Sequence, residues 1–247
     1  MNPFDSVCDD FYVSMHLGTE MDLPTNRETV LHFFERIQKT YPSMRNFSAR
    51  EKGNFILEQE KDSGSYRWST IEPCRICSGY VNPESVKDAM EQHKLILDMA
   101  PYWLSVSPLD CETLDVMFGF DLAYGGNHSE LVAEALGVTP AMESVADLPG
   151  ATILANDPSI TLALDAECRR QCRISIETRT SVQHIRTGEF PEEQLSVYVT
   201  GRQLGSLAQE TSYVETLAEL SSFCEDVIES HVVPNVLTPL ARMIALK

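Results

Sequence analysis

The sequence predicts an α+β fold built from two β-α-β-β-α repeats, with mainly antiparallel sheets and helices packed on one face. Apolar and polar residues alternate over residues 114–122, which is typical of a half-buried strand. Apolar residues recur at helical spacing over residues 30–41, which indicates an amphipathic helix. From residue 113 a similar order of elements begins again. Because the strands alternate instead of running continuously apolar, we expect antiparallel pairing.

The first repeat is expected to occupy residues 1–108. Residues 11–18, FYVSMHLG, suit a short strand. Thr25 and Glu28 have the spacing of a capping box, in which each side chain bonds to the other residue's backbone N–H. A helix is therefore expected to follow and to end before Pro42.

Two alternating runs come next in this repeat. NFILEQE and YRWSTIEPCRICSGYV flank the turn residues 62–65, which indicates a β-hairpin. Asn82 and Pro83 then predict a helix start, with Asn as the cap and Pro at the first position, where its missing N–H costs nothing. This helix is expected to end or kink at Pro101.

The second repeat is expected to occupy residues 109–247 and to carry an extra C-terminal helix. One continuous domain is the alternative. Its first strand is expected to lead into a helix capped by Asn127, and a Pro/Gly/Asp-rich link covers residues 139–158. The later elements are expected to be strands over residues 159–168, 172–182 and 194–201, a long helix over 212–231 and a short helix from Thr238.

The charge balance narrows the classes of partner. The 247 residues include 37 acidic and 19 basic side chains, for a net charge of −18. The negative electrostatic potential of such a protein repels phosphate backbones and anionic lipid headgroups. Neither nucleic acid nor a membrane surface is therefore expected as a partner. The sequence has no secretory signal pattern and no apolar run long enough for a span, which predicts a soluble cytoplasmic protein. Its seven cysteines are then expected to be reduced.

The stretch DLAYGGNHSELVAEALG lies where an expected strand is followed by a helix, and its residue types are those of a catalytic or binding site. Behind Gly125 and Gly126, the helix N-terminus would present free N–H groups to an anion. Asp121, His128 and Glu130 are the candidates for acid–base work there.

The same corner has a structural interpretation, which we favour. Asn127 lies three residues before Glu130, a spacing close to the capping box, and Gly137 is a usual helix terminator. The stretch lacks the Lys-Ser/Thr of a phosphate loop and the third Gly of a dinucleotide fingerprint.

Four cysteines suggest a metal hypothesis. Cys74 and Cys77, together with Cys168 and Cys172, offer four thiolates that would complete a tetrahedral zinc site. Cys74 and Cys77 point to opposite faces if they share a strand, unless Pro73 makes a local turn. Packing explains the second pair better, because cysteine is a small, often buried hydrophobe. No metal or other cofactor is therefore expected, and the four-cysteine site is the alternative.

Two patches are candidates for meeting a partner. Arg169, Arg173 and Arg179 share the odd-numbered face of an expected strand, and guanidinium groups bind carboxylate or phosphate. Pairing with the protein's own glutamates is the favoured alternative.

Residues 213–231 carry a narrow apolar seam, which packs on the protein's own sheet or on a second copy in a homodimer.

The function predicted from these observations is binding without catalysis, of an unidentified small ligand or a protein partner. The sequence carries no clear nucleophile, metal cluster or nucleotide loop. The alternative is an enzyme with hydrolase or phosphate-ligand chemistry, whose site would assemble around the Gly125-Gly126 corner.

Overall fold

The computed structural model describes residues 3–50, 53–208 and 210–247, and within them nine strands form one antiparallel sheet. The predicted α+β class with antiparallel pairing is confirmed. The order across the sheet is β2-β3-β4-β5-β1-β6-β9-β8-β7. The strands are β1 (Asp10–Thr19), β2 (Asn46–Arg50), β3 (Asn54–Glu58), β4 (Tyr66–Glu72), β5 (Arg75–Val81), β6 (Cys111–Tyr124), β7 (Ser159–Ala163), β8 (Arg170–Glu177) and β9 (Glu193–Leu204).

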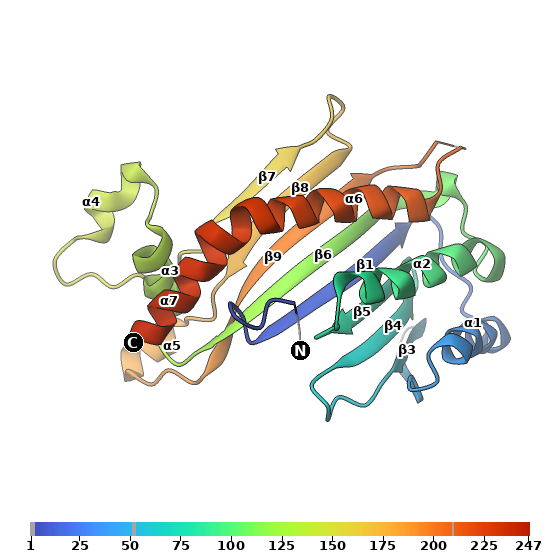
Figure 1. Cartoon of the computed structure of the whole chain (residues 1–247), viewed down its shortest axis with the longest axis horizontal. Helices are drawn as coiled ribbons and strands as arrows, with labels where there is room; N and C mark the ends of the chain where they lie inside the picture. Colours follow the sequence, from blue (N-terminus) through green and yellow to red (C-terminus); the bar gives the residue numbers. More distant parts are fainter. Residues whose placement is uncertain (1–2, 51–52, 209) are drawn as a thin grey trace.

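The long helices cover one face of the sheet (Figure 1). Helix α2 lies against β1 and β5, whereas α6 crosses β6 and β9 and continues through the π-helical segment η4 into α7. The helical segments are α1 (Arg27–Thr40), α2 (Val86–Trp103), α3 (His128–Leu136), α4 (Glu143–Ala146), α5 (Val182–Thr187), α6 (Tyr213–Val227) and α7 (Thr238–Leu246), with η2 (Pro108–Asp110), η3 (Pro140–Met142) and η4 (Ile228–Leu237).

The two halves of the chain meet at the centre of the sheet, where β1 and β6 pair along most of their length. Each of these strands leads into a helix, and each half then returns to the sheet, on opposite sides of the central pair. The order is β1-α1-β2-β3-β4-β5-α2 in the first half, and β6-α3-β7-β8-β9-α6 in the second apart from short helical segments. Two strands were expected between the helices of the first half and three between those of the second, so only the first half contains more strands than expected.

The first half has two more strands than expected between its helices. Glu72 pairs with Arg75, so the chain turns at Pro73 and Cys74 and divides the expected run of residues 66–81 into β4 and β5. The other extra strand is β2, which pairs antiparallel with β3 from Asn46 with Glu58 to Arg50 with Asn54.

Alternating side chains of the central strands build the core beneath the helices. The inward residues of β1 and β6 are fully buried, and Phe11 packs near Phe118 and Phe120 with ring centroids 6.5 and 5.2 Å away. Helix α2 contributes Ile96 and Leu97 to the same cluster. The other parity of these strands therefore faces away from the helices.

Two of the predicted helix starts are displaced. Helix α1 is capped by Asn26, whose side chain accepts the Thr29 N–H, and not by Thr25. Helix α2 is capped by Ser85, because Asn82 instead accepts the Phe11 N–H and adopts a positive φ of 47°. In both cases another residue type that caps well takes the position, Asn26 in α1 and Ser85 in α2.

The C-terminal helices form one continuous body. A capping box between Ser212 and Glu215 opens α6 near the predicted start. The helix does not end near residue 231 as expected, because the π-helical segment η4 continues it past Pro234 into α7. The apolar seam of α6 is buried on the protein's own sheet, through residues such as Leu217 and Leu220. None of the helices in the described residues is long and apolar enough to cross a membrane.

Candidate functional site

The face of the sheet opposite the long helices, which we call the open face, carries polar and aromatic side chains arranged in rows across the strands. Strand pairing places Ser175, Tyr198, Gly119 and Tyr12 in one such row, on β8, β9, β6 and β1. Rows alternate with the core-facing residues, so successive rows are about 7 Å apart along each strand. The open face is therefore an ordered surface whose chemistry changes from row to row.

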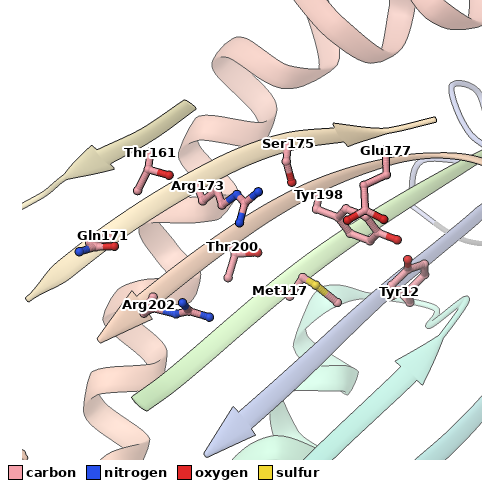
Figure 2. A pocket seen from close by; sticks show the side chains of 10 residues that line it. All are labelled: Tyr12, Met117, Thr161, Gln171, Arg173, Ser175, Glu177, Tyr198, Thr200 and Arg202. Carbon is pink, nitrogen blue, oxygen red and sulfur yellow. The ribbon is translucent and has the colours of Figure 1, made fainter. Parts of the chain in front are cut away.

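A pocket of about 510 Å³ lies on the open face (Figure 2). This volume is in the range of small-molecule sites. Its lining comes from five strands, β1 and β6 together with the consecutive strands β7, β8 and β9. The lining residues are Tyr12, Met117, Thr161, Gln171, Arg173, Ser175, Glu177, Tyr198, Thr200 and Arg202.

Two tyrosines form the aromatic part of this pocket. A Cβ atom on Gly119 would lie 2.3 Å from the Tyr12 ring, so that ring lies directly over the glycine. The centroids of the Tyr198 and Tyr12 rings are 6.4 Å apart, and the ring planes make an angle of 65°. Burial and a hydrogen bond with Tyr198 raise the pKa of Tyr12, so its hydroxyl stays protonated. The two rings offer a ligand π surface and hydroxyl groups.

The opposite end of the pocket is basic. Arg202 donates from Nε and Nη2 to the Asp115 carboxylate, at 2.8 and 2.6 Å. This bidentate pair fixes the guanidinium while leaving Nη1 free to donate. Arg173 donates from Nε to Ser159 at 3.2 Å, and no carboxylate among the described residues lies within 4.0 Å of its nitrogens. Arg173 thus has unsatisfied positive charge.

The aromatic end of the pocket is bordered by carboxylates. Glu177, Ser196, Asp121 and Asp10 form one cross-strand row. Burial raises the pKa of Asp121, and the Asp10 carboxylate raises it further. Arg179 donates to Glu177 Oε2 at 3.3 Å, an exposed pair that neutralises this row only in part.

A second pocket, of about 450 Å³, adjoins the first, and Arg202 lines both. It contains His16, whose pKa is lowered by burial, together with Glu72, Arg75 and Asp115. The Arg202–Asp115 pair therefore forms the boundary between two hollows on the open face.

The candidates at the Gly125-Gly126 corner are not brought together. Asp121 lies on the open face, whereas His128 begins α3, and no hydrogen bond joins their side chains in the described part of the chain. The His128 ring donates to the Tyr124 carbonyl and accepts the Arg179 N–H, so both ring nitrogens are occupied. Burial lowers the pKa of His128, consistent with a neutral ring. The Glu130 side chain is exposed.

The corner instead has the structural elements expected of a cap. Asn127 Oδ1 accepts the N–H groups of Ser129 and Glu130, and its Nδ2 donates to the Ile153 carbonyl. Gly137 ends the helix with a positive φ of 77°. Gly126 lacks room for a Cβ because the Tyr124 ring lies over it.

The Asn127→Ala substitution should therefore lower the free energy of unfolding by about 1–2 kcal/mol, since two backbone N–H groups lose their acceptor. Urea unfolding measures the change. Asn127→Ser is the matched control, because its hydroxyl can still accept a helix N–H without placing a charge against the Ile153 carbonyl, so it should retain more stability than alanine. Equal stability of the alanine variant and the wild type would contradict this role.

The four cysteines of the metal hypothesis are also separated. Cys74 and Cys77 belong to the β4–β5 hairpin, whereas Cys172 lies on β8, four strands away or about 19 Å. Cys168 is exposed in the β7–β8 turn, and Cys172 is buried against Cys224 of α6. No three His, Cys, Asp or Glu side chains within the described ranges are grouped to hold a metal ion.

The arginine candidates have different surroundings. Arg169 donates to the backbone carbonyls of Leu204 and Ser206, and Arg179 pairs with Glu177. Only Arg173 of the three lines the pocket on the open face. The sequence interpretation missed Tyr12, Met117, Tyr198, Thr200 and Arg202. The alternation of Val197 and Val199 with Tyr198 and Thr200 was the available signal for two of them.

Comparison with known proteins leaves this site to be interpreted from its own geometry. No protein-family model and no curated protein matches the chain. A solved structure described as Methanococcus jannaschii TBP is similar at 9% identity and a TM-score of 0.23, over 88% of this chain and 96% of that one. At that TM-score the similarity carries no argument about function.

Proposed function

We propose that this protein is a non-enzymatic binding protein whose small ligand places an anionic group in the 510 Å³ pocket of the open face. The observation that supports this most is Arg173, a cation with no carboxylate partner in the described part of the chain, within a pocket that also contains two tyrosines. A guanidinium in such a position binds carboxylate or phosphate, and the rings hold the ligand's apolar part.

The contacts around Arg173 support recognition of an anion. Thr200 is its cross-strand neighbour on β9, and Arg202 is opposite Gln171 on the next row. These four side chains present hydroxyl, amide and guanidinium donors to one end of the pocket. Because Asp115 holds the Arg202 guanidinium in place, little ordering is needed when a ligand binds.

A cytoplasmic location is part of the same proposal. All seven cysteines are free thiols in the structure, which is the state favoured in a reducing compartment. The excess of acidic side chains supports a small ligand over nucleic acid as the partner.

Phenyl phosphate, which combines an anion with a ring, is a suitable probe. Its addition should perturb the NMR signals of open-face residues, and Arg173→Ala should weaken its binding by at least about tenfold through loss of a charge-assisted contact. Arg186→Ala is the matched control, because it removes one exposed arginine on α5. Equal affinity in the Arg173 variant, or perturbation confined to other surfaces, would contradict the proposal.

A further inference from the structure

The two ends of the open-face pocket carry opposite charges. Arg173 and Glu177 lie on the same face of β8, four residues apart, which separates their Cα atoms by about 14 Å. Figure 2 shows Arg173 and Arg202 at one end, with Glu177 beside Tyr198 and Tyr12 at the other. The pocket is therefore dipolar along the strand direction.

Neutral side chains line the pocket between its two charged ends. Ser175, Thr200 and Met117 line the middle of the pocket. They offer hydroxyl groups and a thioether without a competing charge. A ligand that spans the pocket can therefore carry uncharged polar groups in its centre.

The negative end keeps its charge despite Arg179. Arg179 donates to Oε2 of Glu177 and also to the Ser196 hydroxyl, at 3.3 and 3.4 Å. The Glu177 pair is exposed and uses only one of the two carboxylate oxygens, so Oε1 of Glu177 remains an acceptor. Beside Glu177, across Ser196, the buried Oδ1 atom of Asp121 has no hydrogen-bond partner in the described residues. The faces of Tyr12 and Tyr198 add the negative π surface that attracts an ammonium group.

The charge of the whole molecule also discriminates between ligands. A net charge of −18 opposes the approach of a net anion. A ligand that carries one positive and one negative group avoids this repulsion and still uses Arg173.

We propose that the ligand is an elongated zwitterion of tripeptide to tetrapeptide length, with its carboxylate at Arg173 and Arg202 and its ammonium group at Glu177 and the tyrosines. An extended peptide spans about 3.3–3.6 Å per residue, so three or four residues match the distance between the two charged ends. This inference rests on the proposed function, because it assigns a second charged group to the same ligand.

Alanine peptides test it, with binding followed by calorimetry and NMR. Free trialanine or tetraalanine should bind more tightly than dialanine. N-acetylation of the best peptide should weaken binding to the wild-type protein by at least about tenfold, because it removes the ammonium charge. In Glu177→Gln the difference between the free and acetylated peptides should become clearly smaller, because only the tyrosine faces and the neighbouring acidic row remain to attract the ammonium group. Glu28→Gln, which alters an exposed carboxylate on α1, should leave the difference intact.

The remaining outcomes distinguish the zwitterion proposal from the proposed function. If acetylation has no effect, or an effect that Glu177→Gln leaves unchanged, the zwitterion is wrong. If phenyl phosphate binds the open face and no alanine peptide does, the zwitterion is wrong while the proposed function stands. If neither probe binds there, both are wrong.

Discussion

Replacing Arg202 with leucine is expected to lower the free energy of unfolding by about 3 kcal/mol, because the substitution leaves the Asp115 carboxylate without its cation. The Asp115 side chain is only 8% exposed, so it cannot recover full hydration. Arg202 itself is 44% exposed, and water entering from that side keeps the cost at the lower end of the range for broken buried pairs. Urea unfolding of the purified variant measures the change.

The double variant Asp115→Leu with Arg202→Leu separates loss of the pair from loss of packing. Because it removes both charges together, its stability should return to within about 1 kcal/mol of the wild type. A double variant as unstable as the single one would mean that the arginine acts through its aliphatic stem and not through the carboxylate.

The second large effect is expected from Gly119→Ala. The added methyl would lie 2.3 Å from the Tyr12 ring, so the ring must leave its place over β6. We expect a loss of about 2 kcal/mol from overpacking, measured by urea unfolding. Binding of phenyl phosphate should also be lost, since the displaced ring forms part of the pocket.

Two variants check the cause of this effect. Gly125→Ala places its methyl no closer than 3.9 Å to the Phe190 carbonyl oxygen, so its stability should change by less than about 0.5 kcal/mol. Adding Tyr12→Ala to Gly119→Ala removes the clash and should restore part of the lost stability. If the second substitution only adds a further loss, steric displacement of the ring is not the explanation.

Strands and helices with one buried face were predictable, because burial of one face leaves a regular spacing of apolar residues in the sequence. The alternation over residues 114–122 predicts β6 because one side of that strand faces the helices and the other faces the open surface. The cap of α3 was predictable for a similar reason, since Asn127 acts on its own helix. The start of α2 was not, because Asn82 is held by β1, far away in sequence.

The pocket depended on information that no local pattern contains. Tyr12 and Tyr198 are separated by most of the chain, and only the register of β1 with β6 and of β6 with β9 makes them neighbours. Arg173 was found because it lies in a cluster of arginines that is visible in the sequence. Its pairing state was not visible, since the acidic residues that could have neutralised it are placed by the same long-range register.

The central pairing of β1 with β6 has a consequence for synthesis of the chain. About one hundred residues separate the two strands, so the amino-terminal half leaves the ribosome with one edge of β1 exposed. Until β6 emerges, that edge is open to association with other chains. Contacts this distant in sequence also close slowly, which lengthens the interval during which a chaperone would protect the nascent protein.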